Sequence, residues 1–183
     1  LFRYKSMTYL VRKFSNSKWI NISYENPKPV CTSYISADAF TSCLRTKDNT
    51  LSFWEISDIK DTKELNEIVM ALALNSNTET LSSFDILFFE KNEDLFNSLD
   101  LKFEKTEGDT FISECQNKHL DLINLNYSNM TELLNKLCEY VNNDQHQRFT
   151  KGQIKKLLQA YYKDNPNEQI MLNEDLRKEI GIV

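Results

Sequence analysis

The stretch FDILFFEKNEDLFNSL, residues 84–99, decides the fold that the sequence predicts, because LDLINLNYSNMTELLNKL at residues 120–137 repeats its organisation. In each stretch an apolar run of strand length is followed by a polar turn and then by a helix with acidic residues near its start. Repeated strand–helix units are typical of crossover connections between parallel strands. We therefore expect an α/β or α+β fold in which helices pack on a mixed, partly parallel sheet.

The other elements are predicted from residue type and from cap residues. Strands are expected over residues 8–14, 19–23, 51–56, 101–105 and 119–125, in addition to 84–89. Helices are expected after the N-cap candidates Ser36, Asp61, Asn92, Asn129 and Asn173, and over residues 150–163, with Gly181 as the last C-terminal cap. The two prolines within residues 25–29 indicate a loop.

One helix is predicted by two independent signals. Asp61 and Glu64 have the spacing of a capping box. Apolar residues follow at intervals of three and four, which places them on one helical face: Leu65, Ile68, Val69 and Leu72. We expect this face to pack on the sheet that contains residues 84–89.

The chain is expected to divide into three segments. Residues 1–6 precede Met7, which looks like a natural start, so we expect them to be vector-derived and leave them out of functional argument. Residues 7–144 form the predicted mixed α/β domain. Residues 145–183 are predicted to be a C-terminal helical appendage, joined through a linker at 145–148 and either packed on the domain or extending from it.

The scarcity of glycine excludes several enzyme classes. The chain has three glycines, Gly108, Gly152 and Gly181, and they are too far apart to form a Rossmann, P-loop or α/β-hydrolase motif. Turns that hold phosphates on backbone N–H groups depend on glycine. We therefore expect no cofactor and no tight binding of nucleoside triphosphates or dinucleotides.

Other compositional features bound the setting of the protein. No apolar run approaches the roughly 20 residues that a membrane helix needs. The four cysteines contain no C-x-x-C pair, which favours reduced, mostly buried thiols over a zinc site or disulfides: Cys31, Cys43, Cys115 and Cys138. We expect a cytoplasmic protein that does not bind membranes.

Charge is unevenly distributed along the chain. Residues 1–19 carry five basic and no acidic residues, residues 20–144 carry 10 basic and 22 acidic residues, and residues 145–163 are again free of acids. Such segregation is informative about partners. The predicted partner or nucleic-acid contact surface lies in the C-terminal basic segment: Arg148, Lys151, Lys155, Lys156, Tyr162 and Lys163. The alternative is that these lysines form an ordinary solvated helix face.

Aromatic residues beside basic ones could stack on nucleic-acid bases. Such pairs occur at Tyr9 beside Arg12 and Lys13, and at Tyr161 and Tyr162 near Lys155. The alternative is ordinary packing of these rings in the core and at its rim.

Acidic residues near strand ends offer a weaker, catalytic interpretation. Glu55, Asp58 and Glu90 are the better candidates for a metal-dependent nuclease, whereas Asp85 and Asp121 lie at strand starts, away from the usual site of parallel sheets. The D…E-x-K order of restriction-type nucleases is not matched, because Lys91 follows Glu90 directly. Solvated surface acids are the simpler interpretation, and we predict no metal site.

Cysteine and histidine give a second catalytic alternative. Cys115 and His119 have ligand-like spacing, but two further zinc ligands are not visible. A Cys–His nucleophilic pair stays open, because such residues meet in space rather than in sequence.

These observations favour a non-catalytic binding or regulatory protein that acts with a larger partner. The richness in asparagine, lysine and isoleucine is typical of an AT-rich microbial genome and suggests a mobile-element, defence or toxin-control system. The alternatives are a nucleic-acid-binding protein that uses the basic C-terminal helix, and a metal-dependent nuclease or hydrolase that uses scattered carboxylates.

Overall fold

The computed structural model describes residues 8–19 and 35–182. The strands are β1 (Tyr9–Phe14), β2 (Leu51–Ile56), β3 (Phe84–Glu90), β4 (Lys102–Lys105), β5 (His119–Ile123) and β6 (His146–Phe149). The helices are α1 (Asn16–Trp19), η1 (Ala39–Cys43), α3 (Thr62–Ala73), α4 (Glu93–Ser98), η2 (Ser113–Lys118), α5 (Tyr127–Asn142), α6 (Lys151–Asp164), η3 (Pro166–Met171) and α7 (Glu174–Ile180). Residues 1–6, part of the strand predicted at 19–23, and the predicted proline loop lie outside the described residues.

The strands form one sheet in the order β4-β5-β2-β1-β3-β6, and every neighbouring pair is antiparallel. The prediction of a partly parallel sheet is therefore wrong. The reason is the position of β1, which pairs with both β2 and β3 and so separates the two strands that α3 connects. Likewise β5 and β6, which α5 connects, run in the same direction but have three strands between them. The crossovers exist, but they join strands that are not neighbours.

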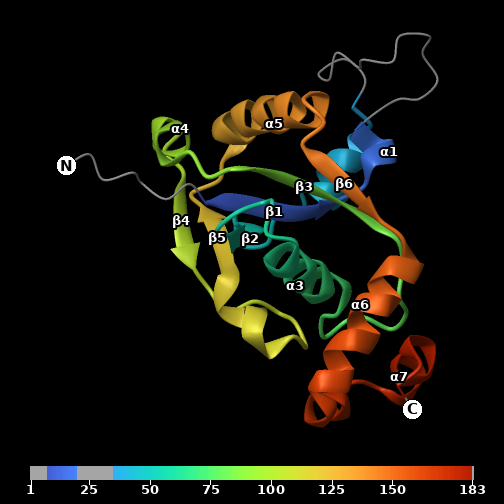
Figure 1. The fold of residues 1–183 in the computed structure, drawn as a ribbon. Helices are drawn as coiled ribbons and strands as arrows, with labels where there is room; N and C mark the ends of the chain where they lie inside the picture. Colours follow the sequence, from blue (N-terminus) through green and yellow to red (C-terminus); the bar gives the residue numbers. More distant parts are fainter. Residues whose placement is uncertain (1–7, 20–34, 183) are drawn as a thin grey trace.

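Helices cover both faces of the sheet, and Figure 1 shows α5 on one face and α3 on the other. The alternation of side chains along β1 supplies both layers, since Val11 joins the cluster under α3 and α6 while Leu10 and Phe14 join the cluster under α5. The α3 layer also contains residues of α6 and α7, and the α5 layer contains residues of α1, η1 and α4.

The helix predicted at Asp61 is confirmed as α3. The Asp61 side chain accepts hydrogen bonds from the backbone N–H groups of Lys63 and Glu64, which satisfies two groups that the helix start leaves open. The Glu64 carboxylate, however, accepts from the backbone N–H and hydroxyl of Ser57.

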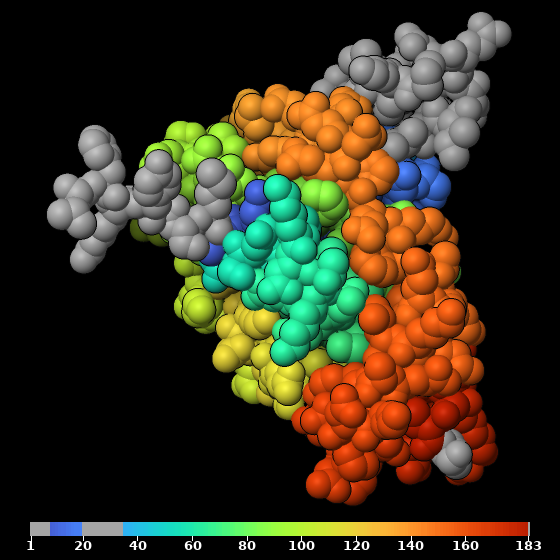
Figure 2. Space-filling model, in the orientation of Figure 1, coloured from blue at the N-terminus to red at the C-terminus, as the bar shows by residue number. Residues whose placement is uncertain are grey.

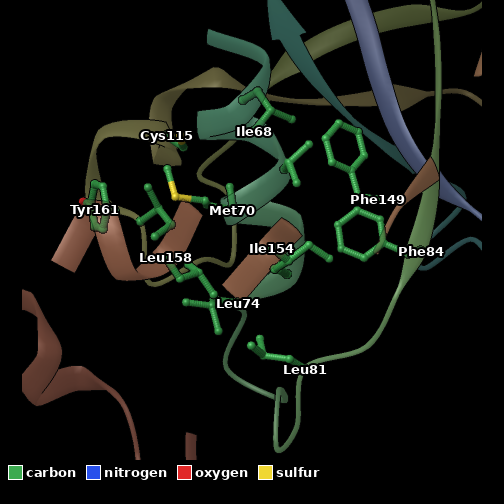
Figure 3. Packing of buried hydrophobic residues seen from close by; sticks show 14 of the residues in the cluster. Ile68, Met70, Leu74, Leu81, Phe84, Cys115, Phe149, Ile154, Leu158 and Tyr161 are labelled. Atoms are coloured by element: carbon green, nitrogen blue, oxygen red, sulfur yellow. The ribbon is translucent and has the colours of Figure 1, made fainter. Parts of the chain in front are cut away.

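The inward face of α3 is also confirmed, with one difference. Leu65, Ile68 and Val69 are buried, whereas Leu72 is only partly buried. Figure 3 shows Ile68 beside Phe149 of the sheet, Met70 and Leu74 near Leu158 and Ile154 of α6, and Phe84 next to Ile154.

Two further helix starts differ from the sequence prediction. The N-cap of α5 is Asn126, which exchanges hydrogen bonds with Asn129 in a capping box, so Asn129 lies inside the helix rather than at its start. The helix predicted after Ser36 is short and continues as the π-helical turn η1, in which Phe40 is exposed and Leu44 beyond it is buried.

The C-terminal segment is part of the same core. Residues 145–148 are predicted as a linker, whereas residues 146–149 form the edge strand β6 and pair with β3. Ile154 and Leu158 of α6 and Leu176 and Ile180 of α7 belong to the cluster that contains the buried face of α3. Figure 2 shows the orange and red C-terminal residues in direct contact with the rest of the molecule.

Candidate functional site

Two central strands separate from each other over half their length. Tyr9–Val11 of β1 pair with Trp54–Ile56 of β2, but the last three residues of β1 pair only with β3, and Leu51–Phe53 pair only with β5. Antiparallel neighbours normally exchange backbone hydrogen bonds along their length. The separation therefore leaves an opening in the middle of the sheet.

The Arg12 side chain bridges this opening. Its Nε donates to the carbonyl oxygen of Cys43 at 2.8 Å, and its Nη1 donates to the carbonyl oxygen of Ser52. Burial lowers the pKa of Arg12 to about 10, although the nearby Cys43 and Asp121 oppose that change. At neutral pH the guanidinium therefore keeps its positive charge inside the opening.

A cavity of about 790 Å³ borders the opening. Its lining includes four cationic side chains, Arg12, Lys13, Lys18 and Arg148, and one carboxylate, Asp85. Hydroxyl groups line it as well: Ser15, Ser17, Ser42, Ser52 and Ser83. This set of charges and donors suits an anion.

Three of the four cations form no ion pair with a carboxylate of the described residues: Arg12, which donates to backbone carbonyls, and the two lysines, Lys13 and Lys18. The Lys13 ammonium lies 4.5 Å from the centre of the Phe84 ring, and burial lowers the pKa of Lys13. The Lys18 ammonium donates to the hydroxyl of Ser42 at 2.7 Å. Both ammonium groups retain donors for a ligand, since each lysine carries three.

The one carboxylate that the described residues contribute to the lining, Asp85, already has hydrogen-bond partners. Asp85 has a side-chain exposure of 5% and accepts a hydrogen bond from Arg148 at 2.9 Å. The backbone N–H of Asn16 donates to the same oxygen at 3.4 Å. Arg148 is 60% exposed, so most of its side chain still faces solvent at the cavity.

The cavity also adjoins the start of α6. The hydroxyl of Ser83, which lines the cavity, accepts from the backbone N–H of Lys151, the first residue of that helix. The N-terminal end of a 14-residue helix carries partial positive charge. It therefore adds to the attraction that the four cations exert on an anion.

The structure separates the residues that the sequence predicted as one contact surface. Arg148 lies at the cavity, and Lys156 and Lys163 are exposed on α6. Lys151 forms an ion pair with Glu179 of α7, and Lys155 lies half-buried on the same side. Tyr162 has an exposure of 0%, so the prediction that it contributes to a contact surface is wrong. Its ring packs in the α3 layer rather than beside the lysines.

The acidic candidates do not converge. Glu55 forms an ion pair with Lys91 at 2.8 Å. Tyr9 pairs with Ile56 on one side and with Glu90 on the other, so Glu90 shares a face with Ile56, whereas Glu55 lies on the opposite face. Within residues 8–19 and 35–182, no three His, Cys, Asp or Glu side chains are grouped so as to hold a metal ion.

The surroundings of Cys115 and His119 are those of buried, packed side chains rather than of a nucleophilic pair. Burial raises the pKa of the Cys115 thiol to about 12, which keeps it protonated and a poor nucleophile at neutral pH. Burial also lowers the pKa of His119, whose ring packs edge-on against Trp54 at 5.1 Å and whose Nδ1 lies 2.7 Å from the Thr106 hydroxyl. Cys43 and Cys115 are free and buried, and Cys138 is buried.

Sequence reasoning did not assign Lys13 and Lys18 to a site with Arg148 and Asp85. The available signal was the acid-free start of the chain, where five basic residues occur before residue 20. That signal indicated positive charge but not which residues would share the cavity with Lys13 and Lys18. Arg148 is more than 100 residues away from them in the sequence and reaches the cavity because β6 pairs with β3.

Comparison with known proteins finds no matching family model and no significantly similar curated protein or solved structure. No helix in the described part of the chain is long and apolar enough to cross a membrane.

Proposed function

We propose that this chain is a non-catalytic binding or regulatory protein that holds an anionic group of its partner in the cavity beside β1 and β2. The observation that carries the proposal is the excess of positive charge there: of the described residues, four cations and one carboxylate line a volume of about 790 Å³. Anions bind where positive side chains and hydroxyl donors converge in a partly desolvated space.

The setting of the protein is also a proposal. A cytoplasmic location agrees with the free, buried thiols of Cys43 and Cys115. A microbial mobile-element, defence or toxin-control system rests on composition alone.

A titration with inorganic phosphate tests the binding function. Trp54 lines the cavity, so its fluorescence reports occupancy. At constant ionic strength we expect a saturable change for the wild-type protein and none for the double variant Lys13→Met with Lys18→Met. The matched control is Lys156→Met with Lys163→Met, two exposed lysines on α6, which should respond as the wild type does. Absence of a saturable change in the wild type, or an equal change in both variants, would contradict the proposal.

A nucleic-acid-binding function is the second candidate, and one observation favours it. Arg148 lies at the cavity, the start of α6 adjoins it, and the same helix carries the exposed Lys156 and Lys163. A phosphate backbone binds such surfaces with strong salt dependence. Retention on single-stranded DNA or RNA columns that falls steeply with salt would support this candidate, and retention unaffected by salt would contradict it.

A further inference from the structure

The cavity has an apolar side as well as a basic one. Trp54, Leu72 and Phe84 line it and also contribute to the hydrophobic layer under α3. Lys13 adjoins the apolar side, because its ammonium lies over the Phe84 ring. A ligand that fills this space therefore meets rings and aliphatic carbon next to cations.

The excess of positive charge favours a multiply charged anion, because three lining cations form no ion pair with a carboxylate of the described residues. Asp85 is paired with Arg148, which leaves Lys13 and Lys18 without a carboxylate partner among the described residues, and Arg12 keeps its buried charge. A phosphate monoester is close to doubly charged at neutral pH, since its second pKa is about 6. It also offers three strong acceptor oxygens, which suit the ammonium and hydroxyl donors of the cavity.

The size of the cavity indicates that the phosphate carries a further group. Small-molecule sites have volumes of roughly 300–1,000 Å³, and this cavity of about 790 Å³ lies in that range. Inorganic phosphate alone would leave the apolar side next to water. A ring against Trp54, Leu72 and Phe84 would displace that water and gain from apolar burial.

We propose that the occupant is an aryl phosphate, with its phosphate near Lys13 and Lys18 and its ring against Trp54, Leu72 and Phe84. This inference rests on the proposed anion-binding function and names the chemistry of the anion. An aryl phosphate has two sources, a free small molecule and a phosphotyrosine side chain of a protein partner. The phosphate ester and ring are common to both.

Calorimetric titration with three probes tests the proposal. Inorganic phosphate, methyl phosphate and phenyl phosphate carry the same anionic group on bodies of increasing apolar area. We expect phenyl phosphate to bind at least about tenfold more tightly than methyl phosphate, because ring burial adds favourable free energy. Equal affinities for the two esters would overturn the proposal and leave the anion-binding function in place. If none of the three probes binds, both proposals fail.

Two variants locate the groups responsible. Leu72→Ala should reduce the preference for phenyl over methyl phosphate several-fold while inorganic phosphate still binds. Lys13→Met should weaken all three probes. The matched control is Leu157→Ala, which also trims a partly buried leucine of the α3 layer, but on α6 and outside the cavity lining. A phenyl preference that is unchanged in Leu72→Ala, or equally reduced in Leu157→Ala, would overturn the proposed position of the ring.

A comparison with phosphopeptides distinguishes a free aryl phosphate from a phosphotyrosine side chain of a protein partner. A short peptide with phosphotyrosine is compared with phenyl phosphate and with the same peptide carrying phosphoserine. Tighter binding of the phosphotyrosine peptide than of phenyl phosphate would support a protein side chain as the source. Binding of phenyl phosphate without the peptide would support a free small molecule. Preference for the phosphoserine peptide would overturn the aryl requirement.

Discussion

At the scale of single residues, Arg12 decides whether the opening in the sheet is stable. Its guanidinium occupies the carbonyl oxygens of Ser52 and Cys43, from β2 and the end of η1, at the level where β1 no longer pairs with β2. A buried carbonyl oxygen without a donor costs free energy. Arg12 is therefore a structural residue as well as a source of positive charge for the cavity.

We predict that Arg12→Met lowers the free energy of unfolding by about 2 to 4 kcal/mol, because it removes two hydrogen bonds from a charged donor and leaves their acceptors unpaired. Urea denaturation measures the change. Arg45→Met, at an exposed position, is the control and should stay within about 0.5 kcal/mol of the wild type. Equal effects of the two substitutions would show that the Arg12 hydrogen bonds contribute nothing specific.

The carboxyl group of Glu64 should make the stability of the protein depend on pH. Burial would raise the pKa of its carboxyl, but hydrogen bonds from Ser57 and the nearby Lys118 outweigh burial and lower it. A carboxyl with a lowered pKa in the folded state stabilises the protein above its unfolded pKa and loses that contribution as pH falls through the folded value. The stability difference between wild type and Glu64→Gln should therefore be present at neutral pH and shrink below about pH 4. Denaturation across pH checks this, and a constant difference would contradict it.

At the scale of elements, most strands and helices follow from local sequence, and the exceptions have physical reasons. Residues 145–148 are predicted as a linker because Gln145, Gln147 and Arg148 are polar. Short edge strands such as β6 (His146–Phe149) are often polar too, so the sequence did not distinguish the two. Asn129 has the sequence context of an N-cap, but the N-cap of α5 is Asn126, three residues earlier. The direction of each crossover was predictable from the repeated units. The insertion of β1 between β2 and β3 was not, because strand order depends on contacts between distant segments.

The burial pattern of α3 refines the expected effect of its substitutions. Ile68 has an exposure of 0%, so Ile68→Ala should lower the free energy of unfolding by about 2 to 5 kcal/mol, as core truncations do. Leu72 is partly buried and borders the cavity, so Leu72→Ala should cost less than Ile68→Ala. Guanidinium denaturation of both variants checks the order. A larger loss for Leu72→Ala would mean that α3 packs differently.

The basic face of α6 is tested by separating its lysines into two groups. Lys151→Glu places a carboxylate beside Glu179 and should lower the melting temperature, because the ion pair is replaced by repulsion. Lys156→Glu with Lys163→Glu should leave folding nearly unchanged, since both positions are exposed. If α6 is a partner or nucleic-acid contact, this double variant also loses salt-dependent binding. Full binding by the folded double variant would remove α6 from the contact surface.

At the scale of the whole molecule, the candidate site exists because the first strand lies in the middle of the sheet. That position brings Lys13 and Lys18 beside Asp85 and Arg148, from β3 and β6, around one cavity. Composition indicated that the chain has basic segments, but it contains no information about which of them meet. The sequence prediction placed the main contact surface on α6, whereas the structure provides a cavity that adjoins the start of that helix.

The three glycines lead to the last prediction, which concerns nucleotides. Gly108 lets its loop pack on Trp54, since an added Cβ would lie 2.4 Å from that ring, and Gly181 ends α7 with φ of 82°. Gly152 lies in the first turn of α6 with open space around it. None of them builds a turn that directs several backbone N–H groups at a phosphate chain. Calorimetry with ATP, GTP and NAD should therefore show no saturable heat at micromolar protein, although a phosphate monoester can bind more weakly through lysine side chains. Saturable heat with any of the three would show that the cavity's cations suffice for tight nucleotide binding without a glycine-built turn.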